Sequence, residues 1–446
     1  MARRPHISWR WAILVGWCGF LFFYGLSGPL YRTEALRAII GQSALDGHWL
    51  TPTLYGEPFL TKPPGIYAAI GLASWPAGRV TEETARLPSA IAAALTVLFA
   101  FATLRQFVDG RKAFIAALLL PISFLWLDKV PSAEIDMLQL AWVSAALMCF
   151  LRTVGAHPPA DAGGSPVNDS PSAGGTLQIA RTPGVCRGMD TAPCVMPVLC
   201  RSSLAWSVAA LLCVAGGFLT KWTAPAFFYL TVGPFLVWRG RWRWLFGRDH
   251  LIAAAIAVLL CAAWAAAVAS QVGWDTLSDT VAREASPRFA PKANGKPYPW
   301  AQSLAFPAIV LAAHLPWSIP ALFALRPTFL RGLDEKSRLL VQLLHCWAWP
   351  NLLFWSLPAQ HNVRYILPIC PAITLLGVIV VLHWVEYAGT SIRRLASPRT
   401  ALVSVLLAWI VVKIVFVEAV VRDRTSNRNA RETGEEIARL VPPGEI

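Results

Sequence analysis

The sequence predicts an all-α integral membrane protein, a polytopic helical bundle of about eleven transmembrane helices. Its 446 residues are 56% hydrophobic and 14% charged, with a mean hydropathy of +0.50, which is too apolar for a soluble domain of average composition. The apolar residues also gather in runs of about the length that crosses a bilayer. These runs lie near 11–30, 86–107, 113–127, 133–151, 203–220, 222–238, 251–270, 301–325, 339–357, 365–384 and 400–421.

Tryptophan content and charge distribution agree with a membrane location. The chain has 21 Trp residues, and indole favours the two membrane–water interfaces. A net charge of +14 can indicate a nucleic-acid partner, but Lys and Arg are spread between the apolar runs rather than gathered on one face or in one tail. We therefore expect membrane lipids, and no nucleic acid, as partners.

The positions of the positive charges predict the orientation of the chain. With a cytoplasmic N-terminus, most Lys and Arg fall in short cytoplasmic loops, whereas the whole 31–85 loop has only Arg32, Arg37, Lys62 and Arg79. Cytoplasmic loops carry such an excess of Lys and Arg. We expect a multi-pass protein of the plasma (inner) membrane, with the 31–85 loop and the active site on the extracytoplasmic side.

Composition divides the chain into four parts. Residues 1–152 are expected to form an N-terminal transmembrane module that contains the first external loop, 31–85. Residues 153–202 are rich in Pro, Gly and Ser without periodicity, which predicts a disordered cytoplasmic insertion. Residues 203–421 are expected to form a C-terminal transmembrane module, followed by a short external tail, 422–446.

The first external loop is predicted to contain two juxtamembrane helices. Residues 32–46 place apolar and charged side chains at spacings of three and four, the pattern of an amphipathic helix that lies along a membrane surface. Asp46 and Gly47 end it. Residues 65–75 are apolar but too short to span, and Pro76 ends them, which predicts a second interfacial helix.

Ionisable residues at the external ends of the apolar runs are the candidates for chemistry, because charges at membrane depth are costly unless paired or hydrated. A carboxylate can act as a general base, and Lys or Arg can stabilise charge on a departing phosphate. The alternatives are cations that only reach to the head groups and carboxylates that only favour a helix dipole. The candidates are Glu34, Lys62, Glu134, Asp136, Lys221, Arg288, His361, Arg364 and Tyr365.

Six segments in this order carry a family resemblance: RTEALRA, GHWLTPTLYGEPFLTKPPG, ARLPSA, AEIDM, GFLTKWTAP and RYILPICP. The chain resembles the membrane-embedded glycosyltransferases of the C-type fold (GT-C), and within them the bacterial aminoarabinose transferase and protein O-mannosyltransferase relatives. The likeness runs from about residue 30 to about residue 375, apart from the 153–202 segment.

The resemblance implies transfer of a sugar from a polyprenyl-phosphate donor to an acceptor (lipid A, protein or another glycan) on the extracytoplasmic side. Glu34 and Asp136 match acidic positions of the family and are the predicted catalytic residues. Relatives have an Asp-Glu pair where this chain has Thr33 and Glu34, which leaves Glu34 as the candidate base. Some relatives have a glutamate where this chain has Thr61, so no cofactor is assigned and a divalent metal stays an open alternative.

The same comparison, with position in the sequence, predicts a site for the phosphate and sugar of the donor. Lys62 matches the lysine of the family's Lys-Pro-Pro motif, which is expected near the lipid phosphate. The other members match phosphate-contacting positions of relatives, stand beside Glu34, or lie between two apolar runs. The predicted set is Arg37, Lys62, Lys221, Arg288, Arg364 and Tyr365.

Two other functions compete with this interpretation. A secondary transporter or lipid flippase is the first, but such proteins often have internal repeats and charged sites near the bilayer midplane, and neither is visible in the sequence. The second is a relative without activity, because Thr33 replaces an acidic residue of the family.

Overall fold

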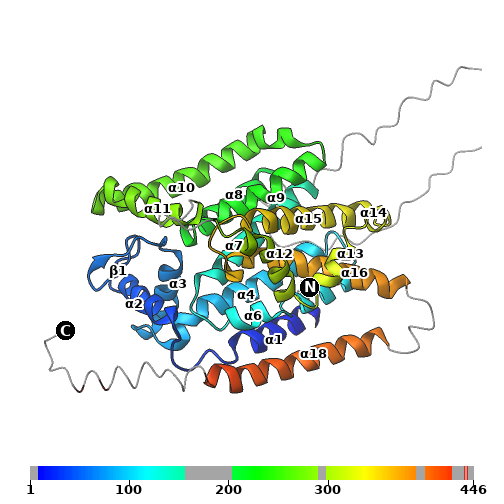
Figure 1. The fold of residues 1–446 in the computed structure, drawn as a ribbon, viewed down its shortest axis with the longest axis horizontal. Coiled ribbons are helices and arrows are strands. Elements are labelled where there is room, and N and C mark those ends of the chain that lie inside the picture. Colours follow the sequence, from blue (N-terminus) through cyan, green and yellow to red (C-terminus); the bar gives the residue numbers. More distant parts are fainter. Residues whose placement is uncertain are drawn as a thin grey trace, which may run out of the picture.

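The computed structural model describes residues 9–155, 203–289, 298–387 and 397–423 with Glu436 and Arg439, and the backbone alone of residues 285–289. These residues form one bundle of helices with a two-stranded hairpin at one end (Figure 1), which confirms the predicted helical fold. The first half contains α1 (Trp9–Phe23), α2 (Thr33–Leu45), β1 (Thr53–Leu54), β2 (Glu57–Pro58), α3 (Gly65–Ser74), η1 (Trp75–Ala77), α4 (Glu82–Leu104), α5 (Gly110–Leu119), α6 (Phe124–Lys129) and α7 (Ile135–Gly155). The second half contains α8 (Ser203–Thr220), α9 (Ala224–Trp238), η4 (Trp242–Phe246), α10 (Arg248–Val272), α11 (Trp274–Phe289), α12 (Trp300–Ala313), α13 (Ser318–Phe323), α14 (Pro327–Arg331), α15 (Glu335–Trp355), η5 (Val363–Ile369), α16 (Cys370–Tyr387), α18 (Pro398–Val415) and the π-helical η6 (Phe416–Val421).

Six helical stretches within the described ranges are long and apolar enough to cross a membrane. They are α4, α7, α8, α10, η5 with α16, and α18 with η6; the shorter helices α1, α9 and α12 are also apolar. Two predicted runs are interrupted: 113–127 divides into α5 and α6 around Pro121, and 301–325 divides into α12 and α13 around Pro316. Every predicted run therefore contains helix, but helix length does not confirm eleven crossings.

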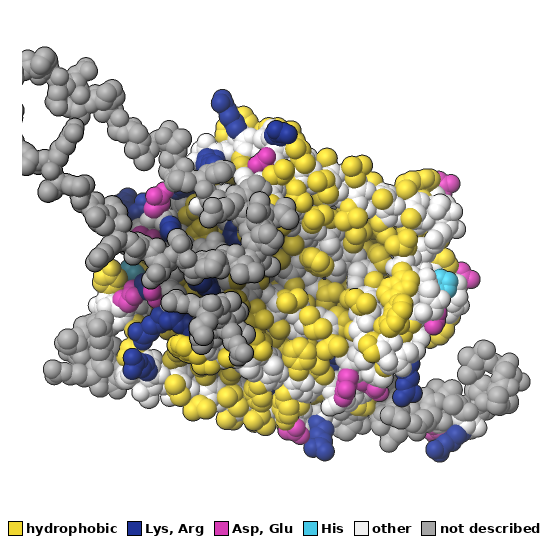
Figure 2. Space-filling view, turned by 180° about the vertical axis from the view of Figure 1, so that it is seen from behind, with side chains coloured by type: hydrophobic (Ala, Val, Ile, Leu, Met, Phe, Trp, Pro, Cys, Tyr) yellow, Lys and Arg dark blue, Asp and Glu magenta, His cyan; other side chains and the backbone are white. Residues whose placement is uncertain are grey.

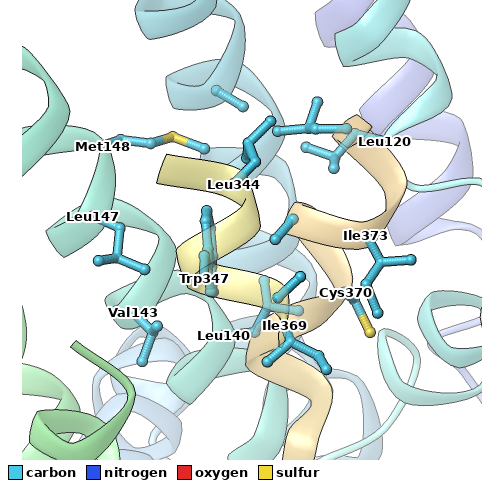
Figure 3. Close-up of a cluster of buried hydrophobic side chains, with 14 of the residues drawn as sticks. Leu120, Leu140, Val143, Leu147, Met148, Leu344, Trp347, Ile369, Cys370 and Ile373 are labelled. Carbon is cyan, nitrogen blue, oxygen red and sulfur yellow. The ribbon is translucent and has the colours of Figure 1, made fainter. Parts of the chain in front are cut away.

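The centre of the bundle lies where α7, α15 and α16 meet. Figure 3 shows Trp347 of α15 in the middle of this cluster, with Val143 and Leu147 of α7 on one side and Ile373 of α16 on the other. The Trp347 indole donates a hydrogen bond to the carbonyl of Pro368 at 2.9 Å. Leaving that buried donor unpaired would cost about 1–3 kcal/mol, so packing and hydrogen bonding together fix the three helices.

The two helices predicted in the first external loop are present as α2 and α3. They pack closely because Gly41 of α2 has no side chain: a Cβ there would lie 2.5 Å from Cγ2 of Ile70 in α3. Gly47, with φ of 102°, turns the chain just beyond the end of α2, in a conformation that glycine adopts without strain.

A hairpin that the sequence analysis did not predict lies between α2 and α3. β1 and β2 are antiparallel, with Leu54 opposite Glu57. The two residues between them, Tyr55 and Gly56, have φ of 53° and 85°, the positive values of a two-residue type I′ turn. Tyr55 occupies the position where such turns usually have Asn or Asp, which explains why the turn was not predicted from the sequence.

The outer surface fits a bilayer. In Figure 2, hydrophobic side chains cover the middle of the visible face, and most charged side chains lie near its margins. The first loop lies at one end of the bundle, beside the junction of α10 and α11 (Figure 1). Trp264 of α10 donates a hydrogen bond to the carbonyl of Leu50 there, and Leu60 packs against Leu277 of α11.

Parts of the predicted domain plan fall outside the described ranges. Residues 153–155, assigned to the insertion, instead continue α7 to Gly155. Residues 156–202 and all but four residues of the 422–446 tail are not described. The module boundaries therefore stay predictions.

Candidate active site

Glu34 lies in the first turn of α2 and is held by four hydrogen bonds. Arg86 of α4 donates Nε to Oε1 at 3.0 Å and Nη2 to Oε2 at 2.8 Å. The backbone N–H groups of Ala133 and Tyr31 donate to Oε1 and Oε2, each at 2.7 Å. Glu34 is 4% exposed and Arg86 is 2% exposed, so this is a buried, bidentate ion pair.

Arg86 also binds the chain that leads into the first loop. Its Nη1 donates to the carbonyls of Leu26 and Gly28, and its Nη2 to that of Pro29, all at 2.8 Å. A buried guanidinium is stable only when its donors find acceptors, and here three carbonyls and one carboxylate supply them. The pair thus connects α2, α4 and the backbone before α7.

A second cluster forms where α7 begins and α8 ends. Asp136, in the first turn of α7, accepts a hydrogen bond on Oδ1 from Lys221 Nζ at 2.8 Å, and each residue is 4% exposed. Lys221 also lies over the ring of Tyr365 in η5, 5.3 Å from its centroid, and Arg364 lies over the same ring at 5.5 Å. Within the described residues the second oxygen of Asp136 accepts no hydrogen bond, so it can still take a proton.

The start of α2 reaches this second cluster. The hydroxyl of Thr33 donates a hydrogen bond to Oε1 of Glu134, the residue two positions before Asp136. The carboxylates of Glu134 and Asp136 both attract the guanidinium of Arg364 electrostatically. The Glu134 carboxylate therefore lies beside Thr33, at the position where relatives have an acidic residue.

A third cluster forms where the end of the first loop meets α11. Lys62 makes an ion pair with Glu284 of α11 and donates a further hydrogen bond to the Thr61 carbonyl at 2.9 Å. Nearby, Arg37 of α2 donates from Nη1 to the hydroxyl of Tyr67 in α3. The Nε of Arg37 is buried without a partner among the described residues, which leaves a donor for an anion.

Tyr67 lies between the second and third clusters. Burial raises the pKa of Tyr67 to about 12; the cation of Arg37 opposes the rise, and the carboxylates of Glu134 and Glu284 add to it. Charges from both clusters thus act on one phenol, so they surround a common region. The phenol stays neutral at physiological pH and can donate or accept a hydrogen bond.

Two apolar cavities lie between the helices. One, of about 720 Å³, is lined by α1, α3, α4, α7 and α8, and its lining contains no charged residue. The other, of about 740 Å³, lies between α8, α9, α10, α11 and the end of α15, and Glu284 is the one charged residue in its lining. Trp222 and Trp355 also line the second cavity, and their indole N–H groups have no partner among the described residues.

A narrow polar pocket of about 20 Å³ adjoins the second cavity. Thr223 and Trp355 line both. Lys221 and Tyr365 line the polar pocket, which brings the second cluster next to the apolar cavity. Together they resemble the site of an amphiphile: an apolar space with unpaired indole donors in its wall and the Lys221 ammonium in the adjoining pocket.

Most of the predicted site residues gather at this region. Asp136, Lys221, Arg364 and Tyr365 form the second cluster, Lys62 belongs to the third, and Arg37 binds Tyr67. Glu34 lies behind, against Arg86. The side chain of Arg288, near the end of α11, is outside the described part. In the ranges that the structure describes, no three His, Cys, Asp or Glu side chains are grouped as a metal site.

Comparison with known proteins identifies related sequences. Residues 61–161 match the family of dolichyl-phosphate-mannose-protein mannosyltransferases. The chain is 28% identical over 377 residues to the undecaprenyl phosphate-alpha-4-amino-4-deoxy-L-arabinose arabinosyl transferase of Pseudomonas paraeruginosa, covering 82% of this chain and 59% of that protein. A transferase of the same name, numbered 2, from Pseudomonas fluorescens is 26% identical over 382 residues, covering 83% of this chain and 60% of that protein. The chain therefore spans about 60% of the length of these curated relatives.

Solved structures give the same fold. ArnT from Cupriavidus metallidurans bound to undecaprenyl phosphate superposes with a TM-score of 0.64 at 18% identity, covering 94% of this chain and 64% of that one. Its apo state gives a TM-score of 0.60 at 18% identity, covering 95% and 72%. The resemblance to the C-type-fold membrane glycosyltransferases is confirmed.

Three residues of the site region, Arg86, Glu284 and Tyr67, were not among the residues predicted from the sequence. Arg86 is part of the quoted ARLPSA motif, and a charge in the first turns of a membrane helix is itself a signal. The partner of Glu284, Lys62, lies 222 residues away in the sequence, so no local pattern connects the two. Tyr67 carries no sequence signal that separates it from an interfacial aromatic residue.

Proposed function

We propose that the protein is a membrane glycosyltransferase that moves a sugar from a polyprenyl-phosphate donor to an acceptor on the extracytoplasmic side. The observation that carries the proposal is that the apolar cavity of about 740 Å³ adjoins a polar pocket. The two share the wall residues Thr223 and Trp355, and Lys221 and Tyr365 line the polar pocket. A lipid carrier needs this combination, because its isoprenoid chain is apolar and its phosphate is anionic. The names of the arabinosyl transferase relatives support the same substrate class.

In this proposal Asp136 is the catalytic base. It takes the proton of the acceptor hydroxyl, whose oxygen then bonds to the anomeric carbon of the sugar. The bond from that carbon to the phosphate oxygen breaks, and the phosphate keeps the electron pair. Lys221 and Arg364, which both lie over the Tyr365 ring, stabilise the charge that builds on the phosphate. Because the polar pocket is narrow, the donor must widen it as it binds.

Glu34 has a different part in the proposal. Each of its oxygens already accepts two hydrogen bonds, which leaves little capacity to take a proton from an acceptor. We assign it to position the first loop, so that Thr33, Arg37 and Lys62 face the second cluster. Arg288 stays a proposed phosphate contact on the strength of the family resemblance alone.

The orientation is part of the proposal. The N-terminus is cytoplasmic and the first loop extracytoplasmic, as the distribution of Lys and Arg favours. The acceptors to be assayed are lipid A, a protein and another glycan.

The experiment that tests the function is a transfer assay. Purified protein in nanodiscs receives a polyprenyl-phosphate sugar, and the product is followed by mass spectrometry; the lipid-linked sugar that co-purifies with the protein indicates which donor to supply. Transfer by the wild type, lost in Asp136→Asn, is the expected result. Movement of the lipid-linked sugar across sealed vesicles without any transfer would refute the enzyme and favour a flippase.

A further inference from the structure

The ion pair between Lys62 and Glu284 lies at the edge of the apolar cavity of about 740 Å³. Glu284 is the one charged residue that lines the apolar space of about 740 Å³, and its carboxylate binds the ammonium of Lys62 from the first loop. The side chains are 17% and 29% exposed for Lys62 and Glu284, so water reaches the pair only in part. An apolar cavity thus ends at a neutralised pair of charges.

A lipid phosphate that approaches the Lys62–Glu284 pair would be repelled by the Glu284 carboxylate. A lipid phosphate whose chain fills the cavity would meet the Glu284 carboxylate at the mouth, and two like charges a few ångströms apart repel strongly where water is partly excluded. Lys62 is the cation that binds Glu284 there, and its ammonium group can bind either anion. Carboxylate and phosphate therefore compete for one ammonium group.

The surrounding structure lets the carboxylate leave while the loop stays docked. Leu60 packs against Val268 and Leu277, and Trp264 holds the Leu50 carbonyl, so the loop keeps its place on α10 and α11 without the ion pair. Among the described side chains of α11, Leu277 alone is buried, which leaves Glu284 on a lightly held helix. A rotation of the Glu284 side chain would move its carboxylate away from the Lys62 ammonium.

We infer that the Glu284 carboxylate holds the place of a lipid-carrier phosphate on Lys62 and is exchanged for that phosphate when the donor binds. Glu284 is then a positioning residue that keeps the ammonium of Lys62 at the cavity mouth while the site is empty. The ion pair must break before the donor binds, which weakens the affinity for the donor. This exchange rests on the proposed donor class. It predicts that removing the charge of Glu284 strengthens the binding of the lipid-carrier phosphate.

The test measures binding of undecaprenyl phosphate to the full chain in nanodiscs for four proteins: wild type, Glu284→Gln, Lys62→Gln and the double variant. Glu284→Gln should bind about fivefold more tightly, the equivalent of one partly exposed ion pair that no longer has to be broken. Lys62→Gln should bind more weakly, and the double variant should show no gain over Lys62→Gln. Asp279→Asn removes a carboxylate from an exposed position of the same helix and should leave the affinity unchanged.

Each outcome decides something different. If the wild type binds and Glu284→Gln binds equally or more weakly, the exchange is wrong while the proposed function stands. An equal gain in Asp279→Asn, or a gain that persists without Lys62, would mean a general charge effect and would also overturn the exchange. If no protein binds undecaprenyl phosphate, the donor class and the exchange fail together. Phosphatidylglycerol added in excess should not compete; if it does, the phosphate belongs to a bilayer lipid and the donor exchange is refuted.

Discussion

The substitution Glu34→Gln separates a positioning role from a catalytic one. Glutamine has nearly the same shape but no charge, and whichever way its amide turns, its NH₂ group faces a donor that Glu34 accepts from. Two of the five hydrogen bonds of Arg86 end on Glu34, and three end on backbone carbonyls. Breaking a buried ion pair from one side costs about 3–5 kcal/mol. Because the carbonyls still hold Arg86, we expect Glu34→Gln to lower the free energy of unfolding by about 3 kcal/mol, the low end of that range.

The measurement is thermal unfolding of the full chain in nanodiscs, followed by intrinsic fluorescence, which 21 Trp residues make sensitive. The matched control is Glu83→Gln, the same chemical change on an exposed glutamate at the start of α4, which should leave Tm unchanged. Arg86→Gln should lower Tm more than Glu34→Gln does, because it also removes the hydrogen bonds to three backbone carbonyls. The double variant should lose less than the sum of the two, because the residues act as a pair.

Activity per folded molecule completes this test. If Glu34 only positions the loop, the folded fraction of Glu34→Gln should keep measurable transfer, with most of its loss in donor affinity. If Glu34→Gln unfolds at the temperature of the wild type and transfers no sugar at all, Glu34 is the base and the structural reasoning is refuted.

Three further predictions concern other parts of the site. Asp136→Asn should lower the transfer rate of the folded fraction by about 10²–10⁴-fold, the usual contribution of a general base; a rate within threefold of the wild type would exclude Asp136. The raised pKa of Tyr67, about 12 against an ordinary value of 10, means that the unfolded chain ionises first, so wild-type stability should fall between about pH 10 and pH 12 and Tyr67→Phe should flatten that fall in Tm against pH. His48→Cys, exposed in the first loop, should react with an impermeant thiol reagent in intact cells, and labelling only from the cytoplasmic side would invert the proposed orientation.

Sequence patterns predicted the helices better than their interruptions. The apolar runs and the two loop helices follow from hydrophobic length and periodicity, which are local properties. The breaks near Pro121 and Pro316 were missed because proline does not decide alone: Pro88 and Pro350 lie inside continuous helices. Membrane helices tolerate proline where neighbouring groups satisfy the backbone, and that depends on packing that a sequence does not display.

The candidate site was predictable in its members but not in its pairing. Residue type and position at helix ends were enough to select Asp136, Lys221 and Lys62 as candidates. The partners of Lys62 and Glu34 come from positions far along the chain, and no periodicity connects them. Charge placement thus located the region, while the division of roles among the carboxylates required the hydrogen bonds.

The anchoring of Glu34 has a consequence for how the molecule is made. Two of its partners are synthesised after it, Arg86 by 52 residues and Ala133 by 99, and Glu284, the ion-pair partner of Lys62, follows Lys62 by 222 residues. When only the first loop has been synthesised, these residues that fasten it do not yet exist. The first loop therefore stays unfastened until α4 and the start of α7 have been made, and its far end until α11 has been made, so the candidate site is one of the last parts of the nascent chain to take shape.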